Sequence, residues 1–119
     1  MEVTTTQYSY CDLIQVKGRV DSYTAPRLSD AFNEIMAMGR HKIILDLAEV
    51  SYVSSAGLRV LIDAQKACRR YAQSQLVLTN VPPRVYETLE LAGFVPLFKV
   101  YDQLESAIDH FRQIGSPEQ

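Results

Sequence analysis

The first twenty residues show the pattern of a β-hairpin. They are enriched in threonine, tyrosine, valine and isoleucine, residue types that favour strands. Cys11 and Asp12 form a turn-like pair, and an apolar run follows them at Leu13, Ile14, Val16 and Val20. We therefore predict two antiparallel strands, of which the second ends within residues 18–21.

Four later segments carry apolar residues at the three- and four-residue spacing of amphipathic helices. The first lies between Thr24, which is placed to cap it, and Gly39, and its apolar stripe is Leu28, Ala31, Phe32, Ile35 and Met38. The second begins close to residues 54–57 and carries apolar residues as far as Tyr71. The third follows the pair at 82–83 and ends at Gly93, and the fourth carries the stripe Leu104, Ile108, Phe111 and Ile114 and ends at Gly115.

Three short strands alternate with these helices, at 43–47, 75–79 and 97–101. The strand at 43–47 is almost wholly apolar, which is typical of a central parallel strand covered on both faces. Pro96 indicates an edge position or a strand start for the last strand. The order ββαβαβαβα predicts one α/β domain over residues 1–115, with a mixed sheet of a hairpin plus mostly parallel strands and four helices. Residues 116–119 are predicted to be a disordered tail.

The composition narrows the class of protein. The 119 residues suit one domain, and 47% hydrophobic with 22% charged residues is ordinary for a globular chain. A net charge of −2 predicts no nucleic-acid partner. Cys11 and Cys68 stand far apart, as free thiols do in a reduced cytoplasmic protein. The apolar runs are too short to span a membrane and the N-terminus lacks a signal peptide, so we expect a cytoplasmic chain without membrane contact.

The segment from Leu45 to Leu58 is the candidate site. We expect it to run from the buried strand through a polar loop to the start of the second helix, beyond the carboxyl ends of the parallel strands, where α/β sheets bind ligands and partners. Ser54 and Ser55 offer two hydroxyls there, and Ala56 and Gly57 leave the backbone approachable. Serines before a helix also act as simple caps, and that interpretation stays open.

These residues resemble a known family. Asp46-Leu47 followed by Val53-Ser54-Ser55-Ala56-Gly57-Leu58-Arg59-Val60-Leu61 is similar to the signature of STAS domains, in particular of bacterial anti-sigma factor antagonists. Residues 18–25 resemble the turn of that family into its first helix, and 89–94 with 97–101 resemble its C-terminal third. The resemblance implies a serine phosphorylated by a partner kinase, at the position of Ser55. Many members have aspartate directly before it where this chain has Ser54, so the choice between the two serines stays open.

The resemblance also implies a function by binding. The unphosphorylated protein would engage an anti-sigma factor that is a serine-protein kinase, would release the sigma factor, and would be switched off by phosphorylation. A phosphoserine phosphatase would be a further partner. The partner surface would comprise Gly18, Asp21, Ser22, Thr24, Ser54, Ala56, Gly57, Leu58 and Arg59. For Asp21 and Thr24 a purely structural role in capping the first helix is the competing interpretation.

Two alternative functions remain beside that of an anti-sigma factor antagonist. A STAS subunit can also scaffold another assembly, such as an ABC transporter. A small serine hydrolase is a remote third, because the nucleophile elbow needs a glycine where Val53 stands. A hydrolase would also need a histidine as general base close to Ser55. We expect His41 at the opposite end of the sheet from Ser55 and His110 in the last helix. Both histidines are expected to be solvated surface residues. The two histidines and two cysteines lack metal-ligand spacing. We predict no enzyme, no catalytic residue, no cofactor and no metal.

Overall fold

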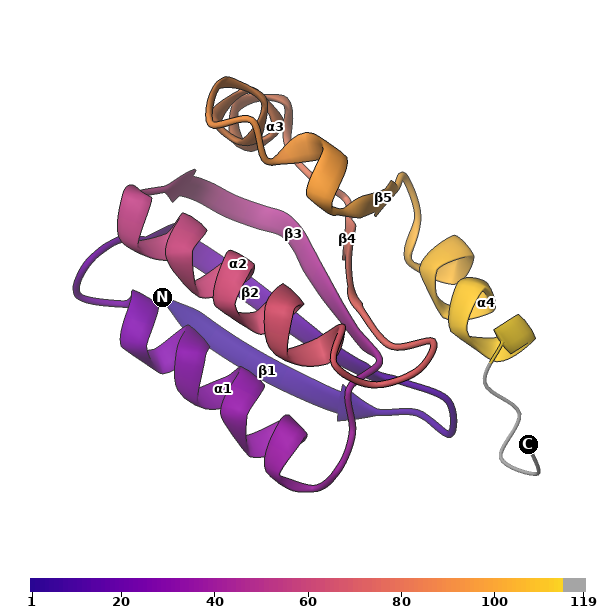
Figure 1. The fold of residues 1–119 in the computed structure, drawn as a ribbon. Helices are drawn as coiled ribbons and strands as arrows, with labels where there is room; N and C mark the ends of the chain where they lie inside the picture. The colour runs from indigo at the N-terminus through magenta and orange to yellow at the C-terminus, as the bar shows by residue number, and fades with distance from the viewer. Residues whose placement is uncertain (115–119) are drawn as a thin grey trace.

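The computed structural model describes residues 1–114, and the predicted tail at 116–119 and domain end at 115 lie outside them. Figure 1 shows the elements in chain order. The strands are β1 (Glu2–Gln7), β2 (Asp12–Val20), β3 (Ile43–Val53), β4 (Leu76–Thr79) and β5 (Lys99–Tyr101). The helices are α1 (Ala25–Ala37), α2 (Ser55–Cys68), α3 (Pro83–Leu91) and α4 (Leu104–Ile114), with a 3-10 turn, η1, at Val95–Leu97.

The strands form one five-stranded sheet in the order β1-β2-β3-β4-β5. The pair β1 and β2 is the predicted antiparallel hairpin, and its turn is closed by a 2.8 Å hydrogen bond from the Tyr8 amide to the Cys11 carbonyl. The pairs from β2 to β5 are all parallel. The mixed sheet, the hairpin and the α/β class are therefore confirmed, and β5 lies at an edge as Pro96 indicated.

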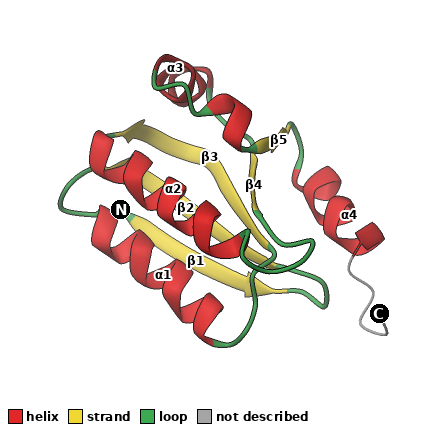
Figure 2. Ribbon diagram, in the orientation of Figure 1, coloured by secondary structure: helices red, strands yellow, loops and turns green. Residues whose placement is uncertain are grey.

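Helices cover the sheet from both faces, as the apolar strand at 43–47 required (Figure 2). Ile43 and Leu45 belong to a large core that also holds the buried side chains of α1, α2 and α3. Ile44 points to the other face, where it packs with Phe111 of α4. Alternate residues of one strand thus enter two cores, because successive side chains of a strand point to opposite faces.

The prediction of a polar loop after residue 47 is wrong. Strand β3 continues to Val53 and stays paired with β2, with Glu49 opposite Lys17 and Val53 opposite Val20. Val50 and Val53 are buried within this extension, while the residues between them are exposed. The register shifts twice in this pairing, so the spacing of buried residues is three rather than two, and a strict alternation pattern could not detect the strand.

Other boundaries also differ from the prediction, and β4 begins one residue later than expected, at Leu76. The last strand begins at Lys99 rather than residue 97, because Pro96 lies in the 3-10 turn that precedes it. Helix α2 ends at Cys68, and Tyr71 lies in the turn that follows.

The two histidines are not the solvated surface residues we expected. His41 is buried, with 8% of its surface exposed, and stacks on Tyr71 at 3.6 Å between ring centroids. His110 is half-buried, and its Nδ1 lies 2.9 Å from the Tyr101 hydroxyl. Burial, with the charge of Lys99, lowers the pKa of His110 below its ordinary value.

Candidate functional site

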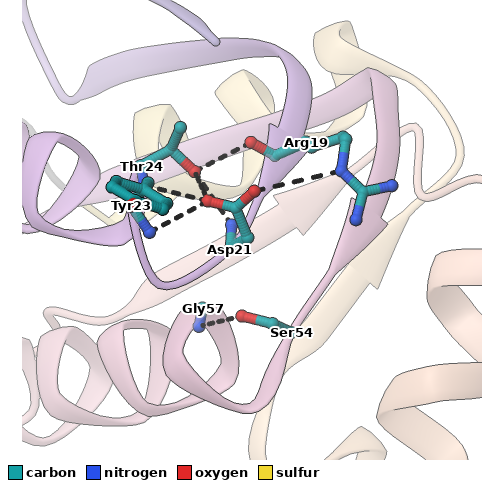
Figure 3. A network of polar contacts seen from close by, with 6 residues as sticks. All are labelled: Arg19, Asp21, Tyr23, Thr24, Ser54 and Gly57. Atoms are coloured by element: carbon teal, nitrogen blue, oxygen red, sulfur yellow. Dashed lines mark hydrogen bonds and ion pairs between the residues drawn. The ribbon is translucent and has the colours of Figure 1, made fainter.

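Two connections meet at the carboxyl ends of β2 and β3 (Figure 3). One is the turn from β2 into α1 and the other is the start of α2. The Ser54 amide donates a 2.8 Å hydrogen bond to the carbonyl of Val20, the last residue of β2. The backbone of Gly57 lies against the same residue, since a Cβ added there would be 2.8 Å from Val20 Cγ1 and 2.9 Å from Val53 Cγ1. The close approach of the two connections therefore requires glycine at 57.

The two serines have different structural roles. Ser54 is the N-cap of α2: its backbone is extended and its Oγ accepts a 3.3 Å hydrogen bond from the Gly57 amide. Ser55 is the first residue of the helix and is exposed. Among residues 1–114 the Ser55 hydroxyl has no hydrogen-bond partner, so it is accessible to a reagent or enzyme in solution.

The turn before α1 is held by Asp21 and Thr24. Asp21 Oδ1 accepts the amides of Tyr23 at 3.0 Å and Thr24 at 3.1 Å. The Thr24 hydroxyl accepts the Asp21 amide at 2.8 Å and donates to the Arg19 carbonyl at 2.9 Å. Hydrogen bonds from Thr24 and Tyr23, with the nearby Arg19 charge, lower the pKa of Asp21 below its ordinary value.

The predicted capping role of Thr24 is only partly right. Thr24 does occupy the N-cap position of α1, but its side chain makes no hydrogen bond to the amides of the helix. The hydroxyl points back to β2 and the turn instead. The competing structural interpretation of Asp21 and Thr24 was helix capping, and the structure shows instead that the two residues close the turn before α1.

Three residues beside this turn were missing from the predicted surface. Tyr23 is 91% exposed although its amide is fixed by Asp21. The Arg19 guanidinium lies 4.4 Å from the ring centroid of Tyr52, and its Nε is 3.9 Å from Asp21 Oδ2. Arg19 and Tyr23 both lie within residues 18–25, the segment that carries the family resemblance, but nothing in the sequence distinguished them from their neighbours. Tyr52 lies within the candidate segment 45–58, but that part of the segment was expected to be a loop rather than the end of β3.

The remaining predicted residues divide by exposure. Ser22 and Arg59 are exposed, and Ala56 is half-buried at the first turn of α2. Gly18 is half-buried with a φ of +103°, a left-handed conformation that glycine adopts without strain. Gly57 and Leu58 are buried at the start of α2.

Neither histidine lies near Ser55. His41 precedes β3 and Ser55 follows it, and the 11 residues of that strand separate the two by roughly 30 Å. His110 lies on α4, whose buried side chains contact the far face of the sheet. Within residues 1–114 no cluster of three potential metal ligands is present. The described helices are all too short or too polar to cross a membrane.

The mixed sheet and the serine-bearing helix start define a class of protein. Residues 2–107 match the STAS domain, and the chain belongs to that family. Among its relatives, BtrV of Bordetella bronchiseptica, named as an anti-sigma factor antagonist, is 35% identical over 82% of this chain and 83% of its own length. The anti-sigma-B factor antagonist of Listeria monocytogenes is 31% identical over 84% of this chain and 86% of its own. The chain is thus a STAS protein of the anti-sigma factor antagonist group.

Solved structures share the fold at low sequence identity. SpoIIAA, an anti-sigma factor antagonist, gives a TM-score of 0.81 in its unphosphorylated form, with 17% identity over 97% of this chain and all of its own. The phosphorylated form from Bacillus gives 0.71, with 16% identity over 91% and 97%. A sulfate transporter family protein from Wolinella succinogenes gives 0.73, with 21% identity over 86% and 84%.

Proposed function

We propose that this chain is a partner-switching protein that binds an anti-sigma factor with serine kinase activity and is released when Ser55 is phosphorylated. The observation that carries the proposal is the difference between the two serines. Ser55 is exposed on the first turn of α2, whereas Ser54 is half-buried and holds the helix cap. A kinase can reach the Ser55 hydroxyl without breaking a contact of the protein. Cytoplasmic action follows, because sigma factors work there.

The switch acts on the partner rather than on the fold. A phosphate adds about −1.5 to −2 charges at pH 7. The amides at the start of α2 tolerate this charge within the protein, since helix N-termini stabilise anions. A loss of about 3–4 kcal/mol at a desolvated contact weakens affinity by two to three decades, which is enough to reverse occupancy.

The proposed contact surface surrounds Ser55 on both connections. It comprises the exposed Ser22, Tyr23 and Arg59, with Ala56 at the helix start and Asp21 at the turn. Tyr23 is the proposed anchor, because exposed tyrosines on fixed backbone lose little entropy when they bind, and tyrosine is enriched among the residues that dominate interfaces. A phosphoserine phosphatase that acts on the same surface would restore the binding form.

The acceptor assignment is tested with the cognate anti-sigma factor kinase and ATP, followed by peptide mass mapping. We expect phosphate on Ser55, none on the Ser55→Ala variant, and normal modification of Ser54→Ala. Ser54→Ala should lose about 1 kcal/mol of stability with its cap, while Ser55→Ala should lose none. Phosphate on Ser54 with Ser55 unmodified contradicts the assignment.

Scaffolding of another assembly is the second candidate. The fold shared with a sulfate transporter family protein supports this candidate. Binding to a kinase that is lost on phosphorylation supports the switching function. Binding to a transporter component that is insensitive to Ser55→Asp supports the scaffold.

The remote hydrolase alternative has its own test. We propose that the protein is not an enzyme, and purified protein should not hydrolyse generic esters. Ester hydrolysis abolished by Ser55→Ala and by replacement of His41 or His110 would restore the enzyme interpretation.

A further inference from the structure

Arg59 occupies a distinctive place relative to Ser55. Both residues lie on α2 and both are exposed. Arg59 follows Ser55 by four positions, so the two side chains project from neighbouring points of one helix face, with Cβ atoms about 5–6 Å apart. An acidic group one turn before a basic group is also the favourable order for such a pair, because it agrees with the helix dipole.

The other charged groups near the helix start are engaged or lie further along. Arg19 and Asp21 pair with each other across the turn before α1. Asp63 follows Arg59 by four positions, but no ion pair joins them, and Arg59 takes part in none of the ion pairs within residues 1–114. The Arg59 guanidinium is therefore free to take a new anionic partner at Ser55.

We propose that Arg59 is the intramolecular partner of a phosphate on Ser55 and binds its dianion over the first turn of α2. The inference rests on the proposed function for the presence of the phosphate. Arginine suits the role because its planar donors match phosphate oxygens in a bidentate geometry. A phosphate dianion also outcompetes the single charge of Asp63.

This pairing would make the switch stronger than the added charge alone. In the unphosphorylated protein the exposed Arg59 presents a positive charge within the proposed contact surface. After phosphorylation the same guanidinium binds the phosphate. A partner then no longer contacts the free Arg59 cation and instead meets the negative charge of the phosphate on Ser55. A partner whose surface carries a carboxylate opposite Arg59 would be repelled by the phosphorylated form.

The test uses full-length protein with phosphoserine encoded at position 55, so no kinase is needed. A ³¹P NMR titration gives the second pKa of the phosphate, which lies near 6 without partners. We expect this pKa to rise by at least about 0.3 units in Arg59→Gln, a twofold change in proton affinity, and to be partly restored in Arg59→Lys. In 1 M salt the difference should fall, because exposed pairs are screened.

Arg70→Gln is the matched control. It removes the same charge from an exposed position beyond the other end of α2, about 20 Å along the helix from Ser55 and outside the screening length at physiological salt. An unchanged pKa in Arg59→Gln, or an equal rise in Arg70→Gln, overturns the pairing. Neither result affects the acceptor assignment, which the mass mapping decides, and a failure of that assignment leaves the titration valid.

Discussion

Asp21 is a residue whose charge holds the turn beside the serines together. Its carboxylate accepts the amides of Tyr23 and Thr24 and faces Arg19. These contacts favour the ionised form and lower the pKa of the carboxyl group. Asp21 therefore fixes the backbone from which the exposed Tyr23 side chain projects.

We predict a pH-dependent stability effect of Asp21→Asn, a change that keeps the acceptor oxygen and removes the charge. Because the pKa is lowered on folding, the stabilisation is complete above the unfolded pKa, near 3.8, and is lost as the pH falls through the folded value. Urea unfolding should show the variant less stable than wild type at pH 7, with the difference vanishing in strong acid. A difference that persists there would point to lost geometry instead.

Asp30→Asn controls for the loss of one negative charge, since Asp30 is exposed on α1 and has no ion pair within residues 1–114. Binding to the anti-sigma factor, measured on the same variants, separates structure from recognition. If Asp21→Asn loses stability but keeps its partner affinity, the residue acts on the turn alone.

At the residue scale, the sequence identified which residues lie at the candidate site better than it predicted the contacts that they make. Ser54, Ser55, Asp21 and Thr24 were all singled out, and all four lie at the meeting point of the two connections. Which serine is engaged could not be predicted, because both spacings suit a helix start and only the fold shows which hydroxyl meets the Gly57 amide. Tyr23 was missed because high exposure leaves no pattern in a sequence.

Among the elements, the start of α2 is the one whose position depends on a single glycine. Gly57 is buried against Val20 and Val53, so the helix lies closer to the ends of β2 and β3 than any side chain at 57 would permit. The contact of Gly57 with Val20 and Val53 therefore determines how far Ser55 lies from the sheet.

We predict that Gly57→Ala destabilises the protein by about 1–3 kcal/mol, the usual cost of overpacking. Alanine favours a helix interior by about 1 kcal/mol, so a stability gain would be expected if the space were open. The added Cβ would instead meet Val20 Cγ1 at 2.8 Å and must push the helix outward. Urea unfolding of Gly57→Ala and of the wild type measures the net change in the free energy of unfolding from overpacking and helix propensity.

A double-mutant cycle identifies the cause. Val20→Ala removes the atom closest to the new Cβ, so Gly57→Ala should cost less in that background than in wild type. The rescue should be partial, because Val53 Cγ1 stays 2.9 Å from the same point. Additive effects of the two substitutions would contradict the proposed clash.

Sequence patterns predicted each α-helix and each strand among residues 1–114 but misplaced several of their boundaries. The alternation rule ended the central strand at residue 47, whereas pairing with β2 extends it to Val53. The rule failed there because register shifts alter which residues face the core. At Pro96 the opposite occurred, since local 3-10 geometry delayed the start of β5.

In the whole molecule, the two ends of the parallel strands carry different contacts. The carboxyl ends of β2 and β3 carry the serine site, while the amino ends are joined by Arg40. Its guanidinium donates to Asp12 Oδ1 and to the carbonyls of Tyr8 and Cys11, so it ties the segment after α1 to the hairpin turn. The overall order of elements was predictable because short connections and right-handed crossovers allow few arrangements.

Arg40→Gln should therefore lower the free energy of unfolding by about 2–3 kcal/mol without changing the proposed phosphorylation of Ser55. The Asp12 side chain is only 4% exposed and would lose its cation, which is costly for a buried carboxylate, though the 26% exposure of Arg40 moderates the loss. Arg112→Gln is the control, because its pair with Asp109 is exposed on both sides and should contribute no more than about 1 kcal/mol. Below the unfolding temperature, phosphorylation of Arg40→Gln by the cognate kinase should match wild type, since β3 separates Arg40 from Ser55. A kinase rate that falls with the stability would show instead that the two ends are coupled through the sheet.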